Sequence, residues 1–177
     1  MLDEGYAAVS TRRVARNVGL TPGLVHYYFK TTDDLLVALY RRATDLNRER
    51  LTAALHSDQP LQALWNLSSD AVRTSLSLEF MALANHRKSI AVEIARYAEY
   101  ARSLQAEAVA RALSRSTLDP GAYPPHGVTV LIAAVARALV MEENVGITSG
   151  HAEARSIVES LLRRLEAQHA PPSTAAN

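Results

Sequence analysis

The sequence contains no cysteine among its 177 residues. This absence excludes a disulfide, a thiolate zinc site and a cysteine nucleophile, and it fits a cytoplasmic protein. A strong excess of one charge is also missing, because the formal net charge at pH 7 is +1. Any binding to nucleic acid must therefore use a local basic patch rather than the overall charge of the chain.

A targeting signal and a long apolar run are missing as well. The first residues contain no basic stretch followed by an apolar one, which is the pattern of a secretory signal. The most apolar run, Val128 to Val140, is interrupted by Arg137 and followed by Glu142 and Glu143. We expect it to be too short and too charged to span a bilayer, so no membrane partner is predicted. A helix that is apolar on nearly every face is expected to be buried or to join a dimer.

The patterns that mark enzymes are missing too. The six histidines form no HxxxH pair, and there is no glycine-rich phosphate loop and no nucleophile elbow. We predict no catalytic residue, no metal site and no cofactor. Glu142 and Glu143 could do acid–base work or bind a cation, but a solvated helix end or a contact to a ligand is the preferred interpretation. The basic cluster His86-Arg87-Lys88 is interpreted first as surface charge and second as a ligand contact.

Helical periodicity dominates what is present, and strand-like alternation is nearly absent, which predicts an all-α fold. Ser10 or Thr11 can cap a helix that runs to about Val18 and ends at Gly19. A second short helix is predicted from Pro22 to about 29. Two short helices joined at residues 19–21 are typical of a helix-turn-helix, which places its second helix in the major groove of DNA.

Longer helices are predicted downstream of this motif. Thr32 is expected to cap a long helix that carries Asp33 and Asp34 in its first turn, where the helix dipole favours carboxylates. Apolar spacing and loop signals then predict helices over 60–76, 78–87, 89–108, 128–145 and 154–165. We predict three parts: a DNA-binding head at 1–40, a helical effector-binding and dimerisation domain at 41–169, and a disordered tail at 170–177.

Four segments together resemble the DNA-binding domain of the TetR family of bacterial transcriptional repressors. They are Glu4-Gly-Tyr, Val9-Ser-Thr-Arg-Arg-Val-Ala15, Gly19-Leu-Thr-Pro-Gly-Leu-Val-His-Tyr-Tyr-Phe-Lys30 and Asp34-Leu-Leu36. The combination covers about thirty residues of the chain. The later part resembles the ligand-binding region of that family only in its number of helices and in its two final helices, which form dimers in the family.

The resemblance implies a set of DNA contacts. Base edges would be contacted from the start of the second helix by Thr21, Pro22, Gly23 and Leu24. The groove wall and a phosphate would be contacted by His26, Tyr27, Tyr28 and Lys30. A hydroxyl and positive charge at the start of the first helix would come from Thr11, Arg12 and Arg13. The core beneath them is expected to hold Val14, Ala15, Val18, Leu20, Val25 and Phe29.

The resemblance also raises a question about the first helix. In the family, a full helix precedes the segment that corresponds to Glu4-Gly-Tyr, and here Met1 to Glu4 stand in its place. We expect either that the natural protein is longer than this sequence, which is the preferred interpretation, or that the DNA-binding head is defective. Each core side chain that loses its cover would forfeit roughly 1.5–3 kcal/mol of burial.

Two further sets of residues are predicted in the body. Large apolar side chains that could line an effector pocket are Trp65, Phe80, Met81, Tyr97, Tyr100 and Met141. Side chains expected to face a second copy of the chain are Val128, Ile132, Val135, Leu139, Ile157, Leu161 and Leu165.

These observations predict a homodimeric, DNA-binding transcriptional regulator. We expect a repressor that a small, largely apolar effector releases from a palindromic operator. The alternative is a dimeric small-molecule-binding protein whose head does not grip DNA, and an enzyme is the third and least favoured interpretation.

Overall fold

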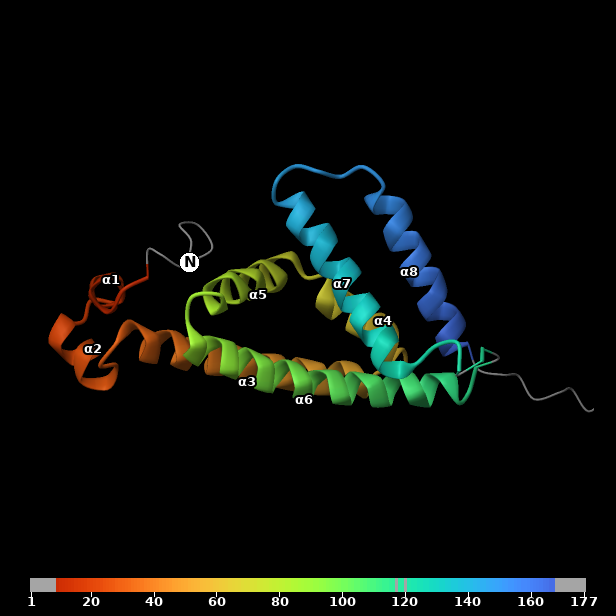
Figure 1. Ribbon diagram of the computed structural model, residues 1–177, viewed down its shortest axis with the longest axis horizontal. Helices are drawn as coiled ribbons and strands as arrows, with labels where there is room; N and C mark the ends of the chain where they lie inside the picture. The colour runs from red at the N-terminus through yellow and green to blue at the C-terminus, as the bar shows by residue number, and fades with distance from the viewer. Residues whose placement is uncertain (1–8, 117, 120, 168–177) are drawn as a thin grey trace, which may run out of the picture. The chain divides into compact units, whose positions relative to one another are not determined.

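The computed structural model describes residues 9–116, 118–119 and 121–167 (Figure 1). Within these ranges the chain is helical and contains no strand, so the predicted all-α fold is confirmed. The helices are α1 (Thr11–Asn17), α2 (Pro22–Tyr28), α3 (Thr32–Leu55), α4 (Pro60–Ser68), α5 (Ala71–Ala84), α6 (Lys88–Leu113), α7 (Pro125–Glu143) and α8 (His151–Glu166).

The chain divides into two compact units. Unit 1 contains the residues up to Arg50 together with Ala71–Tyr100, and unit 2 contains Leu51–Asp70 and the residues from Ala101 onward. The long helices α3 and α6 each contribute to both units. The domain boundaries 1–40 and 41–169 stay a prediction. The predicted tail at 170–177 lies outside the described residues.

The turn between α1 and α2 is closed by local hydrogen bonds. The Ser10 side chain caps α1 by accepting a hydrogen bond from the Arg13 N–H at 3.2 Å. After the helix ends, the Leu20 N–H donates to the Ala15 carbonyl at 2.9 Å, which is the long bond of a Schellman motif. Gly19, which lies between these two residues, has a φ of 68°. Glycine adopts this conformation without steric strain because it has no Cβ.

The next two helices also begin at side-chain caps. Thr21 caps α2 by accepting a hydrogen bond from the Leu24 N–H at 3.4 Å. At α3, Thr31 Oγ1 accepts from the Asp34 N–H at 3.1 Å, and Asp34 Oδ2 accepts from the Thr31 N–H at 2.9 Å. This reciprocal pair is a capping box. The prediction that Thr32 caps this helix is therefore wrong by one residue, because the box needs the residue three positions before Asp34.

Unit 1 is built around a small apolar core shared by α3, α5 and α6. Its buried side chains are Leu36, Phe80, Leu83 and Ile90. The Tyr40 ring meets the Phe80 ring edge-on, with centroids 5.0 Å apart. Next to this core, buried Glu93 of α6 accepts a hydrogen bond from Arg41 of α3 at 2.7 Å. That bond lowers the pKa of the Glu93 carboxyl and joins the two helices.

The segment after α4 differs from the prediction. A single helix was predicted over 60–76 and a shorter piece over 78–87, but α4 ends at Ser68 and α5 runs over Ala71–Ala84. The break falls at Ser69 and Asp70, two residue types whose side chains compete for backbone hydrogen bonds and favour helix ends. Asp70 directly precedes α5, the position where a carboxylate is most favourable.

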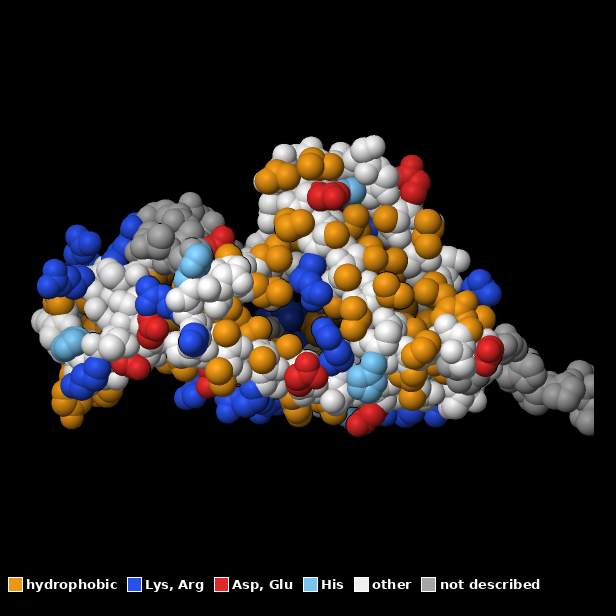
Figure 2. Space-filling model, viewed as in Figure 1, with side chains coloured by type: hydrophobic (Ala, Val, Ile, Leu, Met, Phe, Trp, Pro, Cys, Tyr) orange, Lys and Arg blue, Asp and Glu red, His pale blue; other side chains and the backbone are white. Residues whose placement is uncertain are grey.

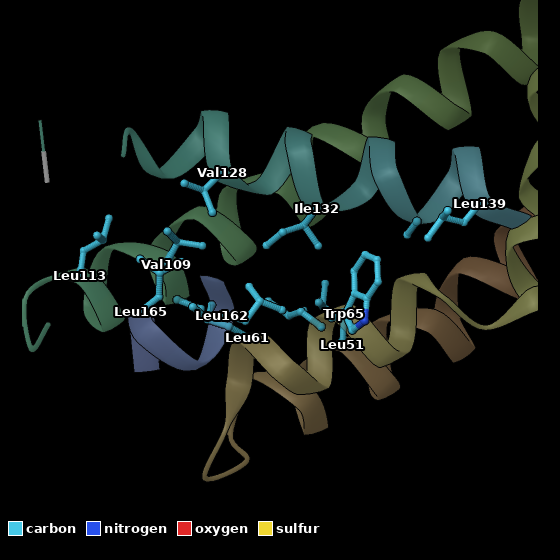
Figure 3. Close-up of a cluster of buried hydrophobic side chains, with 13 residues drawn as sticks. Leu51, Leu61, Trp65, Val109, Leu113, Val128, Ile132, Leu139, Leu162 and Leu165 are labelled. Atoms are coloured by element: carbon cyan, nitrogen blue, oxygen red, sulfur yellow. The ribbon is translucent and has the colours of Figure 1, made fainter. Parts of the chain in front are cut away.

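Unit 2 has a larger core, formed by α4, α6, α7, α8 and the end of α3 (Figure 3). Trp65 of α4 is 2% exposed, and its ring lies beneath α7 near Ile132 and Leu139 (Figure 3). The remaining buried leucines of this cluster are Leu51, Leu61, Leu64, Leu113, Leu162 and Leu165. Because side chains from five helices meet here, this core fixes how α7 and α8 lie on α4 and α6.

The residues predicted to face a second copy differ in how far their own protomer buries them. Four of the seven residues predicted to face a second copy belong to the protomer's own core, at 0–7% exposure: Val128, Ile132, Leu139 and Leu165. Their side chains are largely enclosed by their own protomer, and their contact with a second copy stays a prediction. Ile157 is 70% exposed, and Val135 and Leu161 are half-buried.

Helix α7 is also longer than predicted. It begins at Pro125, and by length and composition alone it could cross a membrane. The prediction that this segment is too short to do so is therefore wrong. A helix that contributes to a protein core passes the same test, and 33% of its apolar window is buried inside the protein.

A charged cluster joins the end of α7 to the start of α8. The His151 ring is buried, with Nε2 at 2.7 Å from Glu142 Oε2 and Nδ1 at 3.4 Å from Glu143 Oε1. Arg155 Nη2 donates to Glu143 at 2.6 Å. The hydrogen bond to Glu142 is the main cause that raises the pKa of His151, with the bond to Glu143 adding to it against the effect of burial. The Glu142–Glu143 pair is therefore a structural partner of His151, not a lone solvated helix end.

The Schellman turn yields a first testable prediction. Gly19→Ala should destabilise the α1–α2 turn by about 1 kcal/mol, because open space surrounds a Cβ at this position and only the positive φ opposes it. Gly23→Ala is the matched control, since it also has open space but lies inside α2, where alanine is the better helix former. Hydrogen exchange of the α1 and α2 amides should accelerate only in the first variant. Equal exchange rates in both variants would contradict this account of the turn.

The charged cluster yields a second prediction, which concerns pH. Because the pKa of His151 is raised in the folded state, its contribution to stability is complete below about pH 6.5 and is lost as the pH rises through the folded pKa. His151→Gln should therefore lower the unfolding temperature at about pH 6 and should flatten its decline towards pH 9. Substitution of the exposed His126 is the control. An unchanged decline in the His151 variant, measured by calorimetry, would show that this cluster does not titrate on unfolding.

Candidate nucleic-acid interface

Helix α2 is held to the protein through one buried side chain, Val25, which is 5% exposed. Every other residue from 21 to 28 is exposed, and the row of predicted base contacts lies on this open surface: Thr21, Pro22, Gly23 and Leu24. Leu24 is 43% exposed although it is apolar. A short helix that presents apolar and hydroxyl groups to solvent over most of its surface is available for contact with a partner.

The residues predicted to meet the groove wall and a phosphate form a connected group at the end of α2. Tyr27 and Tyr28 are each 69% exposed, and their rings pack edge-on with centroids 5.2 Å apart. Lys30 Nζ lies 5.3 Å from the centre of the Tyr27 ring. His26 is exposed on the same helix. The group offers two phenol hydroxyls and one ammonium, which are suitable donors to phosphate oxygens.

Positive charge gathers on the two short helices. Between residues 9 and 30 there are three arginines and one lysine and no acidic residue, whereas the whole chain has a net charge of +1. Arg12 is exposed, and Thr11 and Arg13 are half-buried at the start of α1. Figure 2 shows Lys and Arg side chains over this part of the surface. The two short helices thus carry the kind of local basic patch that binding to nucleic acid would need in a chain of such low net charge.

The core beneath this surface is smaller than predicted. Ala15 and Val25 are buried, and Val14 and Phe29 are half-buried. Val18 and Leu20 were predicted as core residues but are 59% and 46% exposed, so the prediction is wrong for both.

One connection behind the candidate interface was missed by the sequence analysis. Asp33, in the first turn of α3, forms an ion pair with Arg87, and its second oxygen accepts a hydrogen bond from Ser89 Oγ at 3.3 Å. Arg87 and Ser89 flank the start of α6. The pair joins residues 54 positions apart, which no local pattern indicates. Arg87 thus has a structural role in place of the unattached surface charge that was predicted.

The six predicted pocket residues are divided between the two units. Unit 1 contains Phe80, Met81, Tyr97 and Tyr100, and unit 2 contains Trp65 and Met141. Trp65 and Phe80 are fully packed in their cores, Tyr97 is half-buried, and the exposed ones are Met81, Tyr100 and Met141. A cavity of about 340 Å³ within unit 2 is lined by other residues, among them Leu55, Asp58, Pro60, Arg111, Arg115 and Glu166. The effector pocket stays a prediction.

Comparison with known sequences supports the assignment of the N-terminal segment. Residues 1–39 match the sequence model of the family described as "Bacterial regulatory proteins, tetR family". A curated relative, the HTH-type transcriptional regulator BetI of Rhizobium meliloti (strain 1021), is 36% identical over 53 residues. That alignment spans 30% of this chain and 26% of the relative.

Comparison with solved structures extends over nearly the whole chain and shows the fold. A protein of Rhodococcus sp. assigned to the TetR-family transcriptional regulators has a TM-score of 0.72 at 21% identity, and the match covers 94% of this chain and 92% of the other. A regulator of the TetR/AcrR family from Thermobifida fusca YX-ER1 has a TM-score of 0.60 at 20% identity, with 96% and 91% covered. The N-terminal segment of the chain is thus similar in sequence to the TetR family of bacterial regulatory proteins, and the fold is similar to that of TetR-family regulators.

Proposed function

We propose that this protein regulates transcription by inserting α2 into the major groove of operator DNA. The observation that carries the proposal is the exposure of α2, which keeps only Val25 buried and leaves its hydroxyl, aromatic and basic groups open on one short helix. Exposure of Leu24 and both tyrosines to water forgoes the free energy of burying their apolar surface, which is typical of a surface that binds a partner.

The proposed contacts divide into two kinds. Thr21, Gly23 and Leu24 face base edges, where Leu24 can contact a thymine methyl group and Gly23 lets the backbone approach closely. Tyr27, Tyr28 and Lys30 bind the DNA backbone, and the basic start of α1 binds a further phosphate through Thr11, Arg12 and Arg13. The first group sets sequence preference, while the second supplies affinity that depends on salt.

The proposed regulator acts as a homodimer in the cytoplasm. The surface of unit 2 supports this proposal, because α7 leaves Leu131 65% exposed and Met141 54% exposed, and α8 leaves Ile157 70% exposed. Figure 2 shows hydrophobic side chains spread over α7 and α8. Two copies related by a two-fold axis would read a palindromic operator with their two α2 helices.

The proposed activity is repression that a small effector relieves. The effector would have to bind the DNA-free arrangement of the dimer more tightly than the DNA-bound one, because only a difference in affinity can shift the equilibrium. The ion pair between Asp33 and Arg87 supports such control, since it attaches the helix that directly follows α2 to the start of α6.

A second candidate function is a dimeric ligand-binding protein whose helix-turn-helix does not hold DNA. The exposure of Val18 and Leu20 favours it, because apolar side chains open to water contribute little to the stability of so small a core. DNA binding by the purified chain separates the two candidates.

The role of Lys30 gives a third prediction. Lys30→Ala should weaken binding to operator and to random DNA by a similar factor and should reduce the slope of log K against log salt by about one. Lys88→Ala removes the other lysine of the chain, which is exposed at the start of α6, and is the matched control. Fluorescence anisotropy at several salt concentrations measures both. Equal salt slopes for the Lys30 variant and the wild type would rule out its phosphate contact.

The exposed face of α7 and α8 gives a fourth prediction. Leu131→Glu combined with Ile157→Glu should convert dimers to monomers that remain helical, because both side chains are exposed in the protomer and do not belong to its core. Val92→Glu is the control, since Val92 is also 65% exposed but lies in unit 1. Sedimentation velocity and circular dichroism report the two properties. A double variant that still sediments as a dimer would place the interface on another face.

A further inference from the structure

Two arginines stand out inside the apolar part of unit 2. From Pro125 to Met141, Arg137 is the one residue of α7 with a permanent charge, and it is half-buried. Arg102 of α6 is half-buried in the same unit. A guanidinium is charged at every physiological pH, so the fold holds two positive charges partly away from water.

The two arginines extend from facing helices. A small cavity in unit 2 is lined by Gln105 and Val109 of α6 and by Thr129, Ile132 and Ala133 of α7. Arg102 precedes Gln105 by three positions and Arg137 follows Ala133 by four, spacings that put each arginine on the cavity side of its helix, about one turn away. The charge of Arg102 also acts on Arg137: burial first and then this repulsion lower the pKa of Arg137. The two side chains therefore lie near one another at the same end of the cavity.

Neither guanidinium has a partner among the described residues, where neither takes part in a hydrogen bond or an ion pair. The acidic groups at the end of α7, Glu142 and Glu143, are engaged by His151 and Arg155. On α8, the Glu166 carboxylate accepts a hydrogen bond from the Leu61 N–H. On α6, Glu107 lies 3.9 Å from Arg111. Unpaired, partly buried like charges destabilise a fold, so their retention needs a reason.

We propose that Arg102 and Arg137 bind the anionic group of the effector. Two guanidiniums near one another match a carboxylate, phosphate or sulfonate, which can accept hydrogen bonds from both. The walls of the cavity are mainly apolar, with Leu64, Val109, Ile132 and Ala133, and they also hold the polar side chains of Ser68, Gln105 and Thr129. The effector is therefore an apolar molecule that carries one anionic group. This inference rests on the proposed function as an effector-controlled regulator and names the chemical class of its effector.

The size of the cavity adds a consequence for control. Its volume is about 10 Å³, which holds at most one water molecule. The apolar part of a ligand must therefore move α6 and α7 apart as it enters. Arg87, which directly precedes α6, is paired with Asp33. Asp33 lies three positions after Lys30, the last of the proposed DNA contacts, so a shift of α6 acts next to those contacts.

The test compares two fluorescent probes that differ in one charge. 8-Anilinonaphthalene-1-sulfonate is an apolar ring system with a sulfonate, and N-phenyl-1-naphthylamine is the same ring system without it. Titrated into the full chain, the sulfonate should lose about tenfold or more in affinity in both Arg102→Met and Arg137→Met. The neutral probe should bind all of these proteins within about twofold of the wild type, because the apolar walls are unchanged.

Three further variants make the result decisive. Arg137→Lys and Arg102→Lys keep the charge and should retain most of the affinity for the sulfonate, which excludes a folding defect as the cause of any loss. Arg42→Met removes an exposed arginine of α3 and should change neither probe. The inference is overturned if the sulfonate binds the methionine variants as tightly as the wild type, or if both probes weaken together. DNA binding is measured separately. If the probe titrations contradict the inference but the chain binds DNA, only the class of effector is wrong. If the titrations support the inference but the chain does not bind DNA, the proposed function is wrong.

Discussion

The helix-turn-helix depends on the burial of two side chains, Ala15 in α1 and Val25 in α2. No other residue of either short helix is buried, so the free energy that holds α2 in place comes largely from these two and from the Schellman turn between them. Full burial of a valine is worth about 1.5–3 kcal/mol, which is modest support for a functional element. Because so few side chains are buried, the remaining surface of α2 is open. Tight attachment through a broader apolar face would have hidden the groups that are proposed to contact DNA.

A chain of specific contacts leads away from this weakly held helix. The Thr31–Asp34 capping box fixes the start of α3 directly after α2, and Asp33 in the same turn is paired with Arg87 before α6. Helix α6 continues to Leu113 and carries Arg102 in unit 2. The proposed ligand site at Arg102 and the segment proposed to contact DNA are therefore both connected to α6. Communication between them requires that this helix has two arrangements that both sites favour differently.

Much of the fold could be predicted because its signals are local. Ser10, Gly19 and Thr21 fix the ends of α1 and α2 through bonds that span no more than five residues, and the structure confirms both helices within a residue or two of their predicted ends. The predictions failed where packing between distant segments decides the outcome. The apolar stripe of α7 could not indicate which residues face α4 and which face solvent. Val128 and Leu139 were therefore predicted to face a second copy, whereas they lie in the core of their own protomer.

The charged contacts were the least predictable part of the site. Arg87 pairs with a carboxylate 54 positions away, and His151 contacts two glutamates at the end of the preceding helix, α7. Neither contact leaves a periodic trace in the sequence. The exposure of Tyr27 and Tyr28, in contrast, follows from their position on a helix of two turns with one buried residue, and a sequence motif can carry that information.

Selection of binding sites from random DNA tests the central claim most directly. The full chain is incubated with a pool of duplexes that carry a randomised central segment, and the bound fraction is sequenced over several rounds. The account predicts enrichment of an inverted repeat whose half-sites lie about one helical turn, or a multiple of it, apart, because two α2 helices related by a two-fold axis must enter major grooves on matching faces of the duplex. A known operator-binding protein, selected in parallel, should yield its own site. If it does and this chain enriches no sequence, the claim that α2 reads DNA is contradicted.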